Sequence, residues 1–161
     1  MTKEELGQLI LSSERQLYAT AKTILADDQD CADAIQESIV KAFSKIHTLK
    51  NDRYAKTWLI RILINECYNI TRQSGMKEQW NESYAEAMIL HEEHHDYSEL
   101  YKAVNNLKED LRVPVVLYYM EEFSVKEVAR ILDISEGAVQ KRLARARAKL
   151  KKVVHLEEIF I

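Results

Sequence analysis

Residues 124–152 read SVKEVARILDISEGAVQKRLARARAKLKK and decide the fold of the second half of the chain. Ser124, followed three residues later by Glu127, forms a capping box, which predicts the start of a short helix. Residues 133–135 predict a three-residue turn that ends at Ser135, the N-cap of a second and longer helix. A short capped helix, a turn and a second helix are the layout of a helix-turn-helix.

The second helix of this motif separates into an apolar face and a basic face. Helical spacing predicts that four side chains hold it to its own domain: Val139, Leu143, Ala146 and Leu150. Residues 138–152 contain seven Lys or Arg and no acid, although the whole chain has a net charge of -3. In a helix-turn-helix the second helix lies in the DNA major groove. We therefore expect DNA contacts from Ser135, Glu136, Gln140, Lys141, Arg142, Arg145, Arg147 and Lys149.

A plainer interpretation of the basic face is a solvated surface, because helix C-termini favour cations. That interpretation accounts for residues 149–152 but not for the capped helix and turn that precede them. If the helix binds DNA, Gln140, Lys141 and Arg145 are expected to contact bases or nearby phosphates. Glu136 would accept a hydrogen bond from a cytosine amine, whereas the later basic residues would bind phosphates.

The composition extends the helical prediction to the whole chain. Three Gly and one Pro among 161 residues, with 47% hydrophobic residues, indicate an all-α protein that can bury a core. Cys31 and Cys67 have no metal-binding spacing, and two cysteines favour a reduced, cytoplasmic setting. The first ten residues do not resemble an export signal, and the apolar run 58–64 is too short to span a bilayer.

The uneven charge predicts two small helical domains joined by an acidic linker. Residues 78–99 carry seven acids and no Lys or Arg. We expect a first domain at 1–75, an acidic linker at 76–98 and the helix-turn-helix domain at 99–161. The linker is either a solvated spacer or a segment that competes weakly with DNA for the basic helix.

Helical spacing also divides the first domain. One apolar pattern runs from Leu6 to Leu25, and the acidic cluster at 27–30 ends it and offers an N-cap for the next helix. Residues 47–52 are expected to form a loop before a further helix at about 53–72. In the second domain, Pro114 is expected near the start of a helix.

The helix at 53–72 has two faces. Leu59, Ile62, Leu63, Cys67 and Ile70 are expected to turn inward. A second face carries Tyr54, Thr57, Arg61, Asn65, Tyr68 and Arg72. Rings and guanidiniums can stack on unpaired bases while their charge follows the backbone, so this face is a candidate platform for single-stranded DNA. An ordinary amphipathic helix with tyrosines at its rim explains the same pattern, and the residues alone leave both interpretations open.

Three blocks of sequence, taken in order, resemble one family. They are DAIQE with KAF within residues 33–43, TWLIRI with Asn65 and Arg72 within residues 57–72, and the helix-turn-helix at 124–147. Together they resemble bacterial RNA polymerase sigma factors, in particular the extracytoplasmic-function group of the sigma-70 family. The resemblance extends from about Leu6 to Lys152.

The resemblance implies an alternative sigma factor, which is not an enzyme and has no cofactor and no small-molecule substrate. Such a protein binds the clamp coiled coil of core RNA polymerase, captures the -10 promoter element as a single strand and reads the -35 element as duplex. It is commonly restrained by an anti-sigma factor, often a membrane-bound one. By resemblance the polymerase-binding residues are Asp33, Gln36 and Glu37. The -10 residues are Asn51, Arg53, Tyr54, Thr57, Arg61, Asn65, Tyr68 and Arg72.

Some positions depart from the family pattern. Asp133 stands where a glycine is common in the turn, and it is expected to accept the left-handed conformation at modest cost. Asn69, Ala55 and Ala138 also differ from the usual residues, which bears on promoter choice. Trp58 matches the family's tryptophan, and we expect it to pack against the core.

Other functions remain open alternatives. A stand-alone helix-turn-helix regulator would bind duplex DNA without polymerase. His91, His94 and His95 have helical spacing that suits zinc or nickel, although chance histidines in a polar linker explain them as well, and no metal site is predicted. A metal-dependent enzyme built on these histidines would need further ligands that the sequence does not offer. The apolar tail 155–161 is expected to bind an anti-sigma factor or its own domain.

Overall fold

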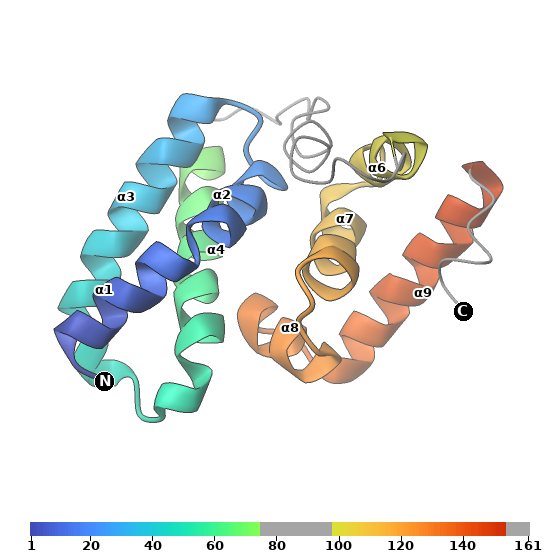
Figure 1. Cartoon of the computed structure of the whole chain (residues 1–161). Coiled ribbons are helices and arrows are strands. Elements are labelled where there is room, and N and C mark those ends of the chain that lie inside the picture. The colour runs from blue at the N-terminus through green and yellow to red at the C-terminus, as the bar shows by residue number, and fades with distance from the viewer. Residues whose placement is uncertain (75–97, 154–161) are drawn as a thin grey trace.

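A computed structural model describes residues 1–74 and 98–153 of the chain (Figure 1). These residues form helices and short connections, and no strand occurs among them. The all-α fold predicted from the composition is therefore confirmed. Figure 1 shows α1 to α4 gathered on one side of the molecule and α6 to α9 on the other.

The first predicted helix is two helices. α1 spans Lys3–Ser12 and α2 spans Glu14–Lys22. Ser13 separates them: it is buried, has φ -104° and ψ 8°, and its N–H donates to the carbonyls of Leu9 and Ile10. The chain turns at Ser13 while the apolar spacing continues, which is why the sequence pattern alone merges the two helices.

α3 (Asp28–Ser44) and α4 (Ala55–Ser74) form the long helical pair of the first half. Asp27 caps α3 by accepting from the N–H of Gln29 at 2.8 Å, so the predicted cap is confirmed. The connection, predicted as a loop, contains two 3₁₀ turns, η1 (Ile46–Thr48) and η2 (Asp52–Tyr54). Fully buried side chains fix the packing of these helices around one core: Leu6, Ile24, Leu25, Leu59, Ile60, Leu63 and Ile64.

The second half begins with α6 (Ser98–Asn105) and α7 (Glu109–Val115), which continues as a π-helical turn, η3 (Val116–Met120). The prediction for Pro114 was wrong: it lies near the end of α7, five residues after the helix begins. Glu109 and Asp110 in the first turn suit the positive end of the helix dipole and mark the true start. Pro lacks the N–H that a helix interior needs, and the helix widens directly after it, with the N–H of Glu121 donating to Val116.

The predicted helix-turn-helix is confirmed. α8 spans Val125–Leu132 and α9 spans Glu136–Val153. Ser124 and Glu127 form both hydrogen bonds of the capping box, each at 3.0 Å. The four apolar residues predicted to anchor α9 are all buried: Val139, Leu143, Ala146 and Leu150.

The two halves contact each other through α4 and α2. α8 packs against α4, and side chains of α2 reach the segment that ends η3 (Figure 1). The second half therefore lies on the side of α4 that faces away from α3.

Candidate nucleic-acid interface

α9 presents an open basic face. Glu136, Gln140, Lys141, Arg145 and Lys149 are all exposed, while the apolar face of the same helix is buried. Ser135 positions the start of the helix because its hydroxyl accepts from the N–H of Ala138 at 3.0 Å. Small residues at 144 and 148 leave room on the exposed side. The structure thus brings most of the residues predicted to contact the -35 element onto one accessible surface.

Two of the predicted contact residues are partly engaged within the protein. Arg142 is half-buried. Arg147 is also half-buried and donates to the hydroxyl of Tyr119 at 3.0 Å, which ties α9 to η3. Arg147 therefore helps to orient α9 as well as adding positive charge to it.

The turn between α8 and α9 adopts the geometry expected of it. Asp133 has φ 55° and ψ 48°, the left-handed conformation, as predicted for a residue that stands in place of glycine. Its N–H donates to the carbonyl of Ala129. This single residue redirects the chain and so sets the angle between α8 and α9.

Asn51 shapes the entry to α4. Its side chain accepts from the N–H of Arg53 at 3.0 Å and caps η2. Asn51 and Arg53 are exposed and Tyr54 is half-buried, so the three predicted contact residues lie together at the start of α4.

Thr57 requires a correction. It was placed on the DNA-binding face, but it is buried, and its hydroxyl donates to the carbonyl of Tyr54 at 2.9 Å. A β-branched hydroxyl one turn into a helix can satisfy itself on the preceding carbonyl, so helical spacing did not distinguish it from its exposed neighbours. In this arrangement Thr57 supports the first turn of α4.

The N-terminal part of the α4 face meets the helix-turn-helix. The guanidinium carbon of Arg130 lies 4.0 Å from the ring centroid of Tyr54, a cation–π contact. A hydrogen bond from Arg130 and its positive charge lower the pKa of Tyr54. About two turns further along, Arg61 of α4 forms an ion pair with Asp133 at 3.5 Å.

Tyr68 continues this face toward the C-terminal part of α4. It is half-buried, and burial together with the nearby carboxylate of Glu109 raises its pKa to about 12. Arg142 and Arg112 act on it in the opposite direction. Tyr68 therefore lies close to charged side chains of the second half and is only partly exposed on the predicted face.

An open cleft of about 430 Å³ lies where the connection between α3 and α4 meets the start of α4. Its lining residues are Thr48, Leu49, Lys50, Asn51, Tyr54, Thr57, Trp58, Arg61 and Arg130. Trp58 packs against the core, as expected, and also lines this cleft. The cleft combines aromatic rings, cations and an amide, which are the groups that hold an unstacked base.

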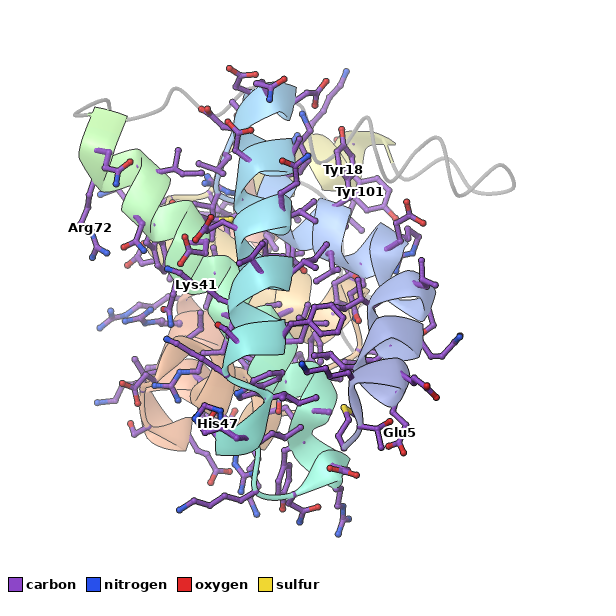
Figure 2. All side chains as sticks on the ribbon, turned by 90° about the vertical axis from the view of Figure 1, so that its left-hand side faces the viewer. Glu5, Tyr18, Lys41, His47, Arg72 and Tyr101 are labelled. Atoms are coloured by element: carbon purple, nitrogen blue, oxygen red, sulfur yellow. The ribbon has the colours of Figure 1, made fainter. Side chains whose placement is uncertain are left out.

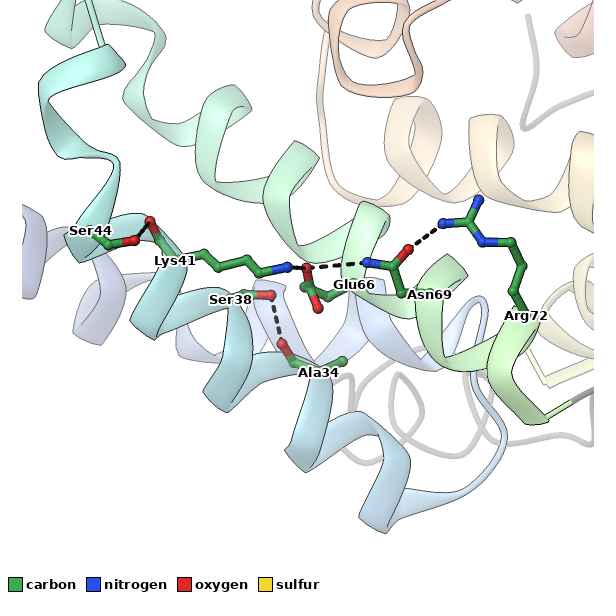
Figure 3. Close-up of polar contacts among 7 residues, drawn as sticks. All are labelled: Ala34, Ser38, Lys41, Ser44, Glu66, Asn69 and Arg72. Atoms are coloured by element: carbon green, nitrogen blue, oxygen red, sulfur yellow. Dashed lines mark hydrogen bonds and ion pairs between the residues drawn. The ribbon is translucent and has the colours of Figure 1, made fainter.

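The far end of α4 carries a chain of polar contacts that sequence reasoning missed (Figure 3). Lys41 of α3 is paired with the buried carboxylate of Glu66, which raises the pKa of Lys41. The amide of Asn69 donates to Glu66, and Arg72 donates to Asn69. This network fixes α4 against α3 and orients Arg72, which remains exposed like Asn65.

α3 presents an acidic stripe on its outer side. Asp33, Gln36 and Glu37, the predicted polymerase-binding residues, are all exposed. Val40 continues the stripe with an exposed fraction of 62%, which is high for an apolar residue. Figure 2 looks onto this side and shows α3 in front, with the second half behind the first. The stripe is therefore accessible whatever the second half covers.

Beside this stripe lies an apolar groove that the sequence did not reveal. It has a volume of about 660 Å³ and lies between α1, α2 and α3. Leu11 is 68% exposed at its edge, and Ile35 and Ile39 are half-buried within it. Leu11 lies outside the apolar spacing that predicted the first helix, so that spacing does not indicate this groove.

Several sequence predictions fall outside the described residues. They are the acidic linker, the cluster of His91, His94 and His95, and the apolar tail 155–161. Within residues 1–74 and 98–153 no group of three or more His, Cys, Asp or Glu is placed to hold a metal ion. None of the helices in those same ranges is long and apolar enough to cross a membrane.

Comparisons with known families decide the identity of the chain. Residues 9–75 match Sigma-70 region 2, and residues 97–150 match Sigma-70, region 4. The chain belongs to the sigma-70 family. It is an alternative sigma factor of the extracytoplasmic-function type, a subunit that binds core RNA polymerase and directs it to promoters. The match to region 2 favours this function over a stand-alone helix-turn-helix regulator.

Curated relatives support this assignment. The sigma factor is 26% identical to RNA polymerase sigma factor SigV of Bacillus subtilis, over 90% of this chain and 88% of the relative. It is 27% identical to RNA polymerase sigma-E factor of Streptomyces coelicolor, over 92% of this chain and 85% of the relative. It is 26% identical to ECF RNA polymerase sigma factor SigM of Mycobacterium tuberculosis, over 91% of this chain and 76% of the relative.

Solved structures share the fold. Sigma factor RpoE of Bartonella quintana, in complex with the anti-sigma factor NepR, superposes with a TM-score of 0.74 at 23% identity, covering 96% of this chain and 99% of that one. CnrH, in complex with the cytosolic domain of CnrY, superposes with a TM-score of 0.72 at 24% identity, and the match covers 97% of this chain and 91% of CnrH.

Proposed function

We propose that the sigma factor divides promoter recognition between its two halves. The second half reads the -35 element as duplex through α9, and the first half holds the -10 element as a single strand through α4. The observation that carries the proposal is the open basic face of α9, set on a capped helix-turn-helix. We further propose that the units span residues 1–75 and 99–161, joined by residues 76–98.

On the -35 side, the exposed residues near the start of α9 are suited to base edges. Gln140 can bond an adenine in two places, and Lys141 and Arg145 can donate to guanine or to phosphates. Glu136 can accept from a cytosine amine. Lys149, together with Arg142 and Arg147, adds positive charge for phosphates, which sets affinity and register and carries no sequence choice.

On the -10 side, the cleft at the start of α4 gives the proposal its chemistry. Tyr54 offers a ring face and Arg61 a guanidinium for stacking on bases, and Asn51 offers an amide. Asn65 and Arg72 are exposed further along α4 and would follow the strand. Arg53 would neutralise a phosphate at the entry. Thr57 acts only by supporting Tyr54, because its hydroxyl is already bonded inside the protein.

On the polymerase side, we propose that the acidic stripe of α3 binds the clamp coiled coil. Asp33, Gln36 and Glu37 provide acceptors, and the exposed side chain of Val40 provides an apolar contact beside them. An apolar centre with complementary charges around it is the arrangement expected of a specific protein interface.

We also propose an anti-sigma factor as a partner, since the two similar proteins, RpoE and CnrH, were each solved with another protein bound, and the protein bound to RpoE is an anti-sigma factor. The sigma factor would act in the cytoplasm, where RNA polymerase lies, and would contribute no catalytic residue of its own. The chemistry of RNA synthesis would belong to the polymerase.

Site-specific photocrosslinking tests this division directly. A photoreactive amino acid at Asn65, or alternatively at Gln140, is introduced into the full chain, which is then assembled with core polymerase on promoter DNA. We expect crosslinks from position 65 to one strand near -10 and from position 140 to duplex near -35. Crosslinks from both positions to the same element would refute the division. A third probe at Lys3, on the exposed side of α1, serves as the control and should crosslink to no DNA.

A further inference from the structure

Asn69 was not among the residues predicted to contact DNA, yet it lies between a buried acid and an exposed cation of α4 (Figure 3). Glu66, Asn69 and Arg72 follow one another at steps of three residues, so their side chains are neighbours on one face of the helix. The amide nitrogen of Asn69 donates to Glu66 at 3.4 Å, and its oxygen accepts from Arg72. We propose that Asn69 is a positioning residue, which holds the guanidinium of Arg72 in place for the -10 strand without neutralising its charge.

The two partners of Asn69 require opposite hydrogen-bonding groups. A carboxylate such as that of Glu66 only accepts, whereas the guanidinium of Arg72 only donates. The side chain between them must therefore donate on one side and accept on the other. The amide of asparagine does both, and an ionised aspartate of the same size could not donate to Glu66. The same two partners fix which end of the amide faces which neighbour.

Glu66 gives this arrangement a fixed end. Its side chain has an exposed fraction of 9%, and its carboxylate is paired with Lys41 of α3. The hydrogen bond to Glu66 raises the pKa of Lys41, so the lysine keeps its charge. Because a buried charge is costly unless it is paired and hydrogen-bonded, Glu66 is tied to the packed interface between α3 and α4. Asn69 extends this fixed point to Arg72, whose long side chain would otherwise lose more conformational entropy on binding.

A neutral acceptor at position 69 leaves the charge of Arg72 available. A carboxylate would also bind the guanidinium, but its negative charge would cancel much of the attraction to a phosphate. That attraction supplies much of the affinity for nucleic acids. Arg72 is exposed, and so is Asn65, which lies four residues before Asn69 on the same side of α4. Asn69 itself is half-buried, so Asn65 and Arg72 would contact the strand while Asn69 supports Arg72 from beneath.

This inference rests on the proposed assignment of α4 to the single strand, and the test distinguishes the two. Full-length wild type, Asn69→Ala, Arg72→Ala and the double variant are each assembled with core polymerase. The probe is a labelled promoter fragment that gives a specific start site in run-off transcription, with a mismatched bubble across its -10 element. Fluorescence anisotropy measures its affinity at several salt concentrations. Gln8→Ala removes an amide from an exposed position of α1 and is the control.

We expect Arg72→Ala to weaken binding several-fold and to lower the slope of log affinity against log salt by about 0.7, the value for one phosphate contact on a single strand. Asn69→Ala should weaken binding by about twofold to tenfold, the range for one hydrogen bond. It should add nothing in the Arg72→Ala background, because Asn69 acts through Arg72. Asn69→Asp should lower the salt slope as Arg72→Ala does, since the new carboxylate neutralises the guanidinium. Gln8→Ala should bind like the wild type.

Two kinds of result would contradict the inference. If Asn69→Ala weakens binding equally with and without Arg72, weakens it no more than Gln8→Ala does, or if Asn69→Asp keeps the wild-type slope, the role of Asn69 is overturned and the strand assignment stands. If Arg72→Ala binds the probe like the wild type, the assignment of Arg72 to the strand is overturned, and the role of Asn69 with it.

Discussion

Arg130 of the helix-turn-helix stacks on Tyr54 at the start of α4, with 4.0 Å between the guanidinium carbon and the ring centroid. These residues are 76 positions apart in the chain and belong to its two different halves. Because the contact joins α8 to the start of α4, it helps to fix how the two halves of the chain are placed.

Substitutions in α9 should separate sequence choice from affinity. Gln140→Ala should weaken binding to the preferred -35 duplex by about 1–3 kcal/mol and relax the preference at one base pair. Lys149→Ala should weaken binding to all duplexes alike and lower the slope of log affinity against log salt by about one. Binding of polymerase holoenzyme to a series of -35 duplexes at several salt concentrations measures both. Equal effects of the two substitutions on every duplex would contradict the roles given to these side chains.

Charge reversal on the outer side of α3 should disrupt polymerase binding. Glu37→Lys places a cation in the acidic stripe near Val40, and we expect affinity for core polymerase to fall at least about tenfold. Glu4→Lys makes the same charge change at an exposed position of α1 and should leave that affinity nearly unchanged. Titration of labelled sigma factor with core polymerase measures both variants. If the two reversals weaken binding equally, general electrostatics rather than the α3 stripe explains the interaction.

The left-handed residue in the turn should tolerate only certain side chains. Asp133→Gly and Asp133→Asn should retain the free energy of unfolding to within about 0.5 kcal/mol, because Gly and Asn accept this conformation and the ion pair with Arg61 is exposed. Asp133→Val should lower it by about 1–2 kcal/mol. Urea unfolding followed by circular dichroism measures the three variants. A valine variant as stable as the wild type would contradict the strain assigned to this residue.

Tyr68 should make the fold sensitive to alkaline pH. Its pKa is raised to about 12 in the folded state, above the value of about 10 for an unfolded tyrosine. The stabilisation from the protonated phenol is therefore complete below about pH 10 and is lost as the pH rises through about 12. Between about pH 9 and about pH 12, the free energy of unfolding of the wild type should fall by up to about 2 kcal/mol more than that of Tyr68→Phe, which lacks the titrating hydroxyl. Parallel pH profiles for the two proteins would show that Tyr68 is not buried in this way.

Local patterns predicted the second half well. The spacing of Val139, Leu143 and Leu150 fixed the buried face of α9, and the Ser124 capping box fixed the start of α8, because each depends on residues three or four positions apart. The prediction for Pro114 failed because it took the start of the helix from the apolar run after Pro114. The helix begins earlier, at the acidic residues Glu109 and Asp110.

The candidate site was harder to predict, because its surroundings come from distant parts of the chain. Spacing placed Thr57 and Tyr68 on one face of α4, but spacing does not show that Thr57 bonds to its own helix or that Glu109 lies beside Tyr68. The contact between Arg15 and Glu121 joins residues 106 positions apart and leaves no local sequence pattern. The groove beside α3 likewise combines side chains of α1, α2 and α3, which no local pattern brings together.

Transcription itself tests the central claim most directly. Run-off transcription combines purified core RNA polymerase, the full-length protein and fragments of the source genome. We expect specific start sites that appear only when the protein is added, and that are lost with Glu37→Lys while Glu4→Lys retains them. No specific start site with the protein present, together with tight duplex binding in the absence of polymerase, would contradict the account.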